Sequence, residues 1–436
     1  MAPAQPLIAP GDRTAAALVV VLALAFHIAS ALLEARSVGL PLSSLGVFGD
    51  GHLYLEIAKS FPLPFAAEGR DYLGQAPGYP ALIYLLRVLV PDDLANWGLL
   101  ALLAAWIPAA LAAGAFYRVC RQAGLRPLAP ALAFVVCNPT WAWLACNPNS
   151  EPLAMCLAIL AFHAYQRDRL GWFAAWLSLA VLSRFPALML VAAYAFDTLW
   201  LRHRRDARTW LLIALPVLVF GAWNLYLFLR IPDFPGVFAA HSIFWQTRPT
   251  WPFDALVQMA PALRWPTDPQ IGLTYLTLFA LLAALPLGLR RSERARWVLP
   301  LWIAVLLLFH VSLSGEPAAW AFPRLVVLAW PAALLVLWRA AAGRVPAALG
   351  ALPCAAAAAL SLWLALPPQT GQVIRLQMAI QSYLQDTLRR LDSDEPHWVD
   401  FREFRKQRRR ALPAERPTPD RSDRPVSGSH PAESRS

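Results

Sequence analysis

The sequence predicts an all-α, polytopic membrane protein. Of its 436 residues, 58% are hydrophobic and only 15% are charged, and the mean hydropathy is +0.46. In an ordinary globular protein about a quarter of the residues are charged. The apolar residues also gather in stretches close to the roughly 20 residues that a helix needs to cross a bilayer. This composition and this spacing favour a chain that is held in a membrane.

The apolar stretches predict about eleven transmembrane helices. The first contains no charged residue besides His27, and its flank carries little positive charge, so we expect a retained helix and not a cleaved signal peptide. Residues 171–201 are too many for one straight span, and arginines flank both ends, which predicts two helices with Arg184 at the apex between them. The predicted helices cover residues 14–33, 94–117, 128–145, 152–165, 172–182, 186–201, 210–229, 271–289, 297–313, 325–338 and 345–366.

Arginines mark one side of this arrangement. They concentrate in alternate loops, at residues 118–126, 167–169, 202–208, 290–296 and 339–344. Because loops rich in Lys and Arg stay in the cytoplasm, this side is expected to be cytoplasmic, together with the N-terminus, residues 1–13. The same rule accounts for most of the net charge of +11 without a nucleic-acid partner. We therefore expect an integral protein of a bacterial cytoplasmic (inner) membrane.

Two long loops fall on the opposite, extracytoplasmic side, at residues 35–93 and 230–270. The first is too long to be a simple connection, and its apolar stretch 79–90 is too short to cross, which predicts short interfacial helices. Beyond the membrane domain, residues 14–366, the composition changes. Residues 367–410 form an amphipathic and basic tail, and residues 411–436, rich in Pro, Ser, Arg and Asp, are expected to be disordered.

The polar groups that could carry chemistry are predicted to lie on the extracytoplasmic side. Asp50 stands between two glycines in the first long loop, and the element Pro77-Gly78-Tyr79-Pro80 follows it. Further candidates lie in later loops and at helix ends on the same side. The whole set is Asp50, His52, Tyr54, Arg70, Tyr79, Glu151, Arg184, Trp245, Glu316 and Arg324.

The pattern Asp50-x-x-x-Tyr54-x-x-Ile57-Ala58, followed by Pro77-Gly78-Tyr79-Pro80, resembles the first extracytoplasmic loop of the C-type (GT-C) glycosyltransferase superfamily. The likeness is to its members related to the GPI mannosyltransferase (PIG-V) and to the protein and lipid-A glycosyltransferases. Later landmarks of these enzymes are similar to Asn149-Ser150-Glu151-Pro152, Leu182-Ser183-Arg184 and Phe322-Pro323-Arg324. In topology the resemblance covers residues 14–366.

The resemblance implies an inverting transferase that takes mannose or a similar sugar from a polyprenyl-phosphate donor to a glycan, lipid or protein acceptor. Asp50 would be the general base, because an acceptor hydroxyl is a weak nucleophile. Arg324, Arg184 or Arg70 would stabilise the leaving phosphate. The other substrate-binding candidates are Glu151, His52, Tyr54, Tyr79, Trp245 and Glu316. No cofactor is implied with certainty, no metal site is assigned, and a divalent cation between Asp50 and Glu151 is left open.

Each candidate also has a structural interpretation. Asp50 could form an Asx-turn, Glu151 could be a charge favoured at a helix N-terminus, and Arg184 could extend to the interface. For the whole chain, the alternatives are a transporter or lipid-linked-sugar flippase, or a non-catalytic assembly protein with the same fold. A transporter would place charges inside its spans and show matching halves.

Overall fold

A computed structural model of the chain describes residues 10–37, 39–47, 50–61, 75–91, 96–204, 206–230, 234, 236–239, 248–254, 257, 269–290, 297–314 and 322–341. All of them belong to one compact unit, residues 1–394, and residues 395–436 form a second unit outside the described part. The predicted helix 345–366 and the tail segments 367–410 and 411–436 also lie outside the described residues.

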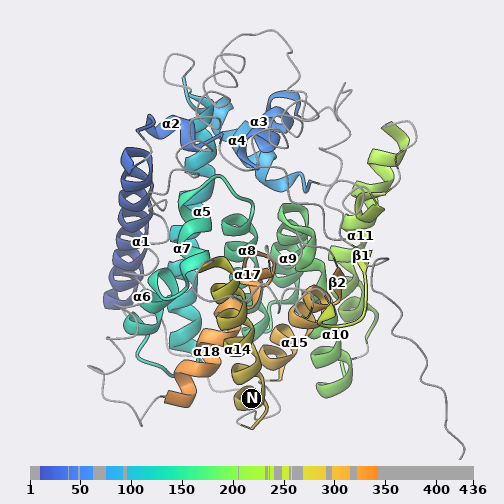
Figure 1. The fold of residues 1–436 in the computed structure, drawn as a ribbon. Coiled ribbons are helices and arrows are strands. Elements are labelled where there is room, and N and C mark those ends of the chain that lie inside the picture. Colours follow the sequence, from blue (N-terminus) through green and yellow to red (C-terminus); the bar gives the residue numbers. More distant parts are fainter. Residues whose placement is uncertain are drawn as a thin grey trace, which may run out of the picture. The chain divides into compact units, whose positions relative to one another are not determined.

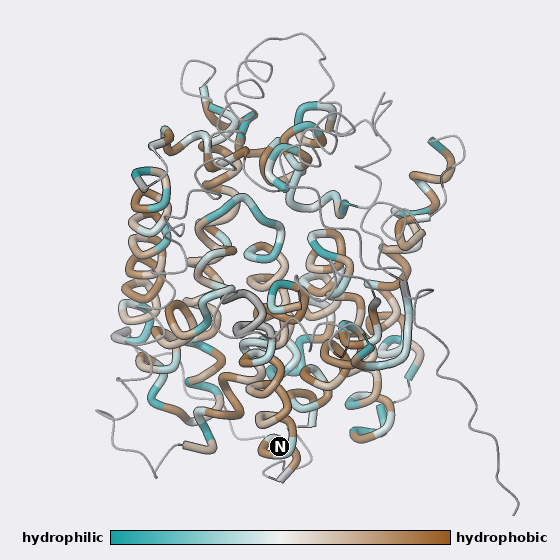
Figure 2. Tube along the Cα trace, in the orientation of Figure 1, coloured by the Kyte–Doolittle hydropathy of each residue, from teal (hydrophilic) through white to brown (hydrophobic). Residues whose placement is uncertain are grey.

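The structure confirms an all-helical, polytopic membrane protein. Within the described residues, three helices contain a segment long and apolar enough to cross a membrane: α1 (Pro10–Ser37), α5 (Trp97–Gln122) and α11 (Ala207–Arg230). Figure 2 shows these helices mostly in the hydrophobic colour. Large apolar side chains on α1 and α11 point outward, such as Val21 (61% exposed) and Leu211 (60% exposed). Such contiguous outward apolar surface is expected where lipid surrounds the protein.

Shorter helices pack between the long ones (Figure 1). They are α8 (Glu151–Gln166), α9 (Leu170–Ser183), α14 (Pro269–Arg290), α15 (Val298–Val311) and α18 (Trp330–Ala341). α8 packs against both α5 and α9, α1 packs along α5, and α11 packs along α9. The buried face of α5 is largely alanine, which lets neighbouring helix backbones come close, as in other membrane bundles.

The predicted helix 128–145 is broken into two in the structure. Two helices, α6 (Leu128–Val136) and α7 (Pro139–Cys146), meet there at a bend of 73°. Asn138 causes the break, because its side chain accepts the backbone N–H of Trp141 at 3.0 Å and so starts a new helix, with Pro139 in the first turn. The indole of Trp330 donates to the carbonyl of Phe134 at 3.2 Å near the end of α6. Both segments stay apolar across the break, so length alone could not reveal it.

Two other predicted helices are divided in the structure. Residues 186–201 form in succession the 3₁₀ helix η3 (Phe185–Leu188), α10 (Met189–Ala195) and the π-helical turn η4 (Phe196–Leu201). Ahead of α18, the chain forms α17 (Phe322–Leu325) and η7 (Val327–Ala329). Arg184 and Arg324 lie at these interruptions, where the backbone is free to turn a side chain inward.

The first long loop carries three short helices, as predicted. They are α2 (Leu42–Leu45), α3 (Gly51–Ser60) and α4 (Gly78–Leu89), and α4 matches the predicted interfacial stretch. α3 and α4 pack on each other, and all three contact α5. Figure 1 shows them together at one end of the helices. The described strands are only two residues long, β1 (Arg248–Pro249) and β2 (Leu313–Ser314), and they pair antiparallel.

Candidate active site

Two carboxylates and two guanidinium groups meet at the ends of four helical segments. Asp50 directly precedes α3, Glu151 is the first residue of α8, Arg184 follows α9, and Arg324 lies in α17. Arg324 donates through Nη2 to Asp50 Oδ2 at 2.6 Å and through Nε to Glu151 Oε1. Arg184 Nη1 lies 2.9 Å from the same Glu151 oxygen. One continuous series of ion pairs thus joins residues as far apart as positions 50 and 324.

The four side chains are buried to different degrees. Glu151 is fully buried, at 0% exposure, whereas the Arg184 side chain is 11% exposed. Asp50 retains 13% exposure and Arg324 retains 23%. Because charge interactions are stronger away from water, Glu151 is held by both arginines inside the protein. The partly open end of the series is the pair of Asp50 and Arg324, and a substrate reaching the site would meet these two groups first.

The ion pairs set the charge state of this open end. Burial by itself raises the pKa of Asp50, but the charge and hydrogen bond of Arg324, helped by His52 and Arg184, outweigh it and hold that pKa below its ordinary value. Burial lowers the pKa of Arg324, and the two carboxylates more than reverse that effect. Asp50 is therefore an ionised carboxylate at neutral pH, able to accept a proton or a hydrogen bond.

Ser150 connects the ion pairs to the aromatic side of the site. Its hydroxyl accepts from the Tyr54 hydroxyl at 3.1 Å and from Arg184 Nη1 at 3.4 Å, and it donates to Glu151 Oε2 at 3.5 Å. Ser150 is also the N-cap residue of α8, yet its side chain makes no capping hydrogen bond. A serine at this position usually caps its own helix, so its use within the site is a sign of function.

Tyr79 lies behind Tyr54 and does not reach open space. It is fully buried, its ring packs edge-to-face on Tyr54 at 4.9 Å between centroids, and its hydroxyl donates to the carbonyl of Ala101 at 2.6 Å. This arrangement supports Tyr54 from behind, and the substrate contact of Tyr79 stays a prediction. Nearby, a Cβ added at Gly51 would come within 2.6 Å of Pro148, so the start of α3 touches the segment that carries Ser150.

The remaining sequence candidates divide into two groups. His52 is buried two residues after Asp50 and contributes to its lowered pKa. Arg70, Trp245 and Glu316 lie outside the described residues. Arg70 and Trp245 belong to the two long loops, 35–93 and 230–270, large parts of which lie outside the described residues.

Sequence reasoning missed Ser150 and a second buried polar group beside the site. Asn147 donates to Glu34 Oε2 at 3.2 Å and to the carbonyl of Trp143 at 3.0 Å, and Trp106 donates to the carbonyl of Cys146 at 3.1 Å. Glu34 stands near the end of α1, just beyond the predicted span 14–33. An acidic residue at the end of an apolar helix was the available signal, and it ties α1 to the segment ahead of Glu151.

The two carboxylates do not present a vacant cation site. Arg324 bridges Asp50 and Glu151 and takes the place between them that a divalent ion would need. In the described part of the chain, no three His, Cys, Asp or Glu residues are grouped so that they could hold a metal. In the described residues, Asp50 and Glu151 therefore form an arginine-bridged pair.

Comparison with known proteins finds a distant likeness to a solved structure. No protein-family model matches the sequence, and no curated protein matches it. Among solved structures, the crystal structure of ArnT from Cupriavidus metallidurans in the apo state is similar, with 15% sequence identity and a TM-score of 0.48. The similarity covers 85% of this chain and 73% of that chain. A likeness of this degree decides nothing about activity, which has to be inferred from the side chains of the site.

Proposed function

We propose that this protein is a membrane glycosyltransferase of the GT-C type that moves a sugar from a polyprenyl-phosphate donor to an acceptor. The observation that carries the proposal is the arginine-bridged pair of carboxylates, Asp50 and Glu151, at the starts of helices α3 and α8. Such a site combines a base for the acceptor with cations for a phosphate leaving group. The sequence patterns around Asp50 and Glu151 that resemble GT-C enzymes fall on this same cluster.

The arginines suit the leaving group. When the bond between the anomeric carbon and the phosphate oxygen breaks, its electron pair stays on the phosphate, whose negative charge grows. Guanidinium groups bind phosphate oxygens through paired N–H donors and are more favourable in a site away from water. Arg324 is the more accessible of the two, at 23% exposure against 11% for Arg184. Arg324 would contact the phosphate first, with Arg184 holding Glu151 behind it.

Asp50 suits the acceptor. Arg324 donates to Oδ2 of Asp50. In the described part of the chain it makes no hydrogen bond to Oδ1, so this oxygen is left for the acceptor hydroxyl. In the proposed step the acceptor oxygen attacks the anomeric carbon from the face opposite the phosphate, its proton passes to Asp50, and polyprenyl phosphate departs. The sugar configuration inverts, and no covalent enzyme intermediate forms. Mannose, or a similar sugar, follows from the family resemblance alone.

The positions of the charges favour this enzyme over a transporter. Asp50 precedes a helix, Glu151 begins one, Arg184 follows one, and Arg324 lies in a short helix ahead of α18. A transporter would need its functional charges near the middle of its spans. The extracytoplasmic location of the site is part of the proposal and rests on the arginine-rich loops at the opposite helix ends.

Transfer from radiolabelled polyprenyl-phosphate mannose in membranes tests the proposal. Asp50→Asn should abolish transfer while the protein is still produced, and Arg324→Ala should raise the KM for the donor more than that for the acceptor. Glu56→Gln is the matched control, because Glu56 lies on α3 but outside the ion pairs, and it should transfer normally. Full transfer by Asp50→Asn would remove Asp50 as the base, and an unchanged donor KM would exclude Arg324 from the phosphate.

A further inference from the structure

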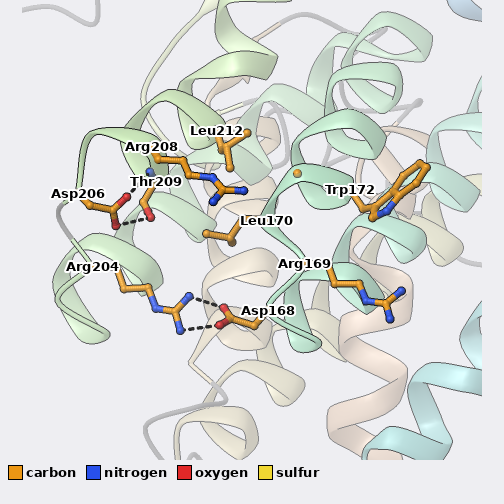
Figure 3. A pocket seen from close by; sticks show the side chains of 10 residues that line it. Asp168, Arg169, Leu170, Trp172, Arg204, Asp206, Arg208, Thr209 and Leu212 are labelled. Atoms are coloured by element: carbon orange, nitrogen blue, oxygen red, sulfur yellow. Dashed lines mark hydrogen bonds and ion pairs between the residues drawn. The ribbon is translucent and has the colours of Figure 1, made fainter. Parts of the chain in front are cut away.

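A second polar site lies at the opposite ends of α8 and α9. The structure has a cavity of about 480 Å³ there, open to the surface. α8 runs 16 residues from Glu151 to Gln166, which is about 24 Å of helix, and Asp168 follows it. Figure 3 shows the lining side chains, which come from the loop between α8 and α9, the start of α9, the loop after η4 and the start of α11. They are Asp168, Arg169, Leu170, Gly171, Trp172, Arg204, Asp206, Arg208, Thr209 and Leu212.

Specific contacts fix the two loops that line the cavity, the loop between α8 and α9 and the loop after η4. Asp168 and Arg204 form a two-fold ion pair, with Arg204 Nη2 2.8 Å from Asp168 Oδ2. The backbone N–H of Arg204 also donates to the carbonyl of Thr198 at 3.1 Å. Asp168 and His203 both adopt left-handed backbone conformations, at φ 61° and 55°, which non-glycine residues rarely hold without surrounding support. Both loops are thus fixed by specific contacts.

The charges of the cavity do not cancel. Asp168 is matched by Arg204, and Asp206 is occupied at the start of α11, where it accepts from the backbone N–H of Thr209 at 2.9 Å and from its hydroxyl at 2.7 Å. Within the described part of the chain, this leaves Arg169 and Arg208 without a carboxylate partner. Figure 3 shows the Arg208 guanidinium extending from α11 across to the Leu170 side. The cavity therefore has an excess of positive charge suited to an anion.

Exposed tryptophans indicate where the anion comes from. Trp172, Trp200 and Trp210 are 58%, 66% and 51% exposed around the ends of these helices. Tryptophans collect at the level of lipid headgroups, where one part of the ring meets hydrocarbon and its N–H meets water. An arginine-lined cavity beside them opens at headgroup depth, on the side that the arginine-rich loops predict to be cytoplasmic. Basic pockets between helices in this position suit lipid phosphates.

We propose that this cavity binds the phosphate headgroup of an anionic phospholipid, with Arg208 beside the phosphate and Arg169 adding positive charge on the other side of the loop before α9. The lipid would join the start of α9 to the start of α11 and stiffen α9, whose other end leads to Arg184 of the active site. This site is separate from the proposed transfer reaction, because it uses none of the residues of the ion-pair cluster.

Native mass spectrometry of the full-length protein in detergent, with added phosphatidylglycerol or phosphatidylcholine, tests the proposal. The wild type should retain phosphatidylglycerol in preference to phosphatidylcholine. An arginine near an anionic lipid surface accounts for about a fivefold change in affinity, so the double variant Arg169→Gln/Arg208→Gln should bind phosphatidylglycerol about 25-fold more weakly. Arg126→Gln, which changes an exposed arginine in another basic loop, is the matched control and should bind it like the wild type.

Two further measurements complete the test. Phosphatidylglycerol should raise the thermal unfolding midpoint of the wild type and of Arg126→Gln, but not that of the double variant. Inorganic phosphate at millimolar concentration should not displace the lipid. Equal lipid retention by the double variant would overturn the proposal, as would an equal loss in Arg126→Gln. Phosphate binding at the cavity with no preference for phosphatidylglycerol would assign it to a soluble anion instead.

Discussion

Arg324 is the residue whose replacement tests the active-site cluster most directly. It makes two charge-assisted hydrogen bonds, one to Asp50 and one to Glu151, and each such bond contributes about 1.5–3 kcal/mol. After Arg324→Gln, Glu151 still has Arg184 at 2.9 Å, so part of its interaction survives. Asp50 then lacks an arginine contact in a site where it is only 13% exposed. Removing one partner of a buried ion pair costs about 3–5 kcal/mol, and we expect a loss of stability in this range.

A double-mutant cycle separates the Asp50 contact from the rest. Arg324→Gln, Asp50→Asn and the double variant are compared with the wild type by SDS-induced unfolding in mixed micelles. The interaction energy between positions 50 and 324 should be about 1.5–3 kcal/mol, because it corresponds to one charge-assisted hydrogen bond. Arg126→Gln, at an exposed position, should change stability by less than about 0.5 kcal/mol. An interaction energy below about 0.5 kcal/mol would show that the pair is not formed, and the structural basis of the proposed site would be refuted.

Three other changes extend this test. Tyr54→Phe removes the hydrogen bond to Ser150, so unfolding experiments should show a loss of about 1 kcal/mol, and unchanged stability would mean that this bond is absent. Gly78→Ala would place a Cβ 2.7 Å from Ser183 Oγ, so it should destabilise the protein by about 1–3 kcal/mol, and wild-type stability would contradict the close contact. The pKa of Asp50 is lowered from its ordinary value in the folded protein, so its stabilising contribution is complete above about pH 5 and is lost as the pH falls through the lower folded value. The acid-side fall in unfolding midpoint should therefore be smaller in Asp50→Asn, and identical pH profiles would show that Asp50 is not linked to folding.

Much of the fold could be predicted because bilayer thickness is a strict constraint on length. α1, α5 and α11 are each long and apolar enough for one complete membrane crossing. The predicted helices 14–33, 94–117 and 210–229 match them apart from a few residues at each end. The break at Asn138 could not be found in the same way, because hydropathy averages over it. Asn138 and Pro139 together form a typical helix start. This local pattern was the available signal, but dividing the chain by the length of its apolar stretches does not use it.

For the site, the sequence predicted only that its residues lie on the same side of the membrane. Counting arginines placed Asp50, Glu151, Arg184 and Arg324 on one side of the membrane, and the structure brings these four into contact. Nothing in one sequence indicates that position 50 meets position 324, because such a contact depends on how the helices pack. Ser150 was missed for a related reason, since two of its partners come from distant parts of the chain, Tyr54 on α3 and Arg184 after α9.

The arginine-bridged carboxylates also bear on the order of events during turnover. In the described cluster, two negative charges balance two positive ones, so a lipid phosphate entering the site adds a charge with no free partner. Arg324 uses Nη2 for Asp50 and Nε for Glu151, so a phosphate bound at its Nη1 would share the same cation with Asp50. The negative charge of that phosphate offsets the cation that keeps the pKa of Asp50 low, and the carboxylate becomes a stronger base. On the proposed function, arrival of the donor would thus activate the base, and an acceptor that arrived alone would meet a carboxylate still engaged with its arginine.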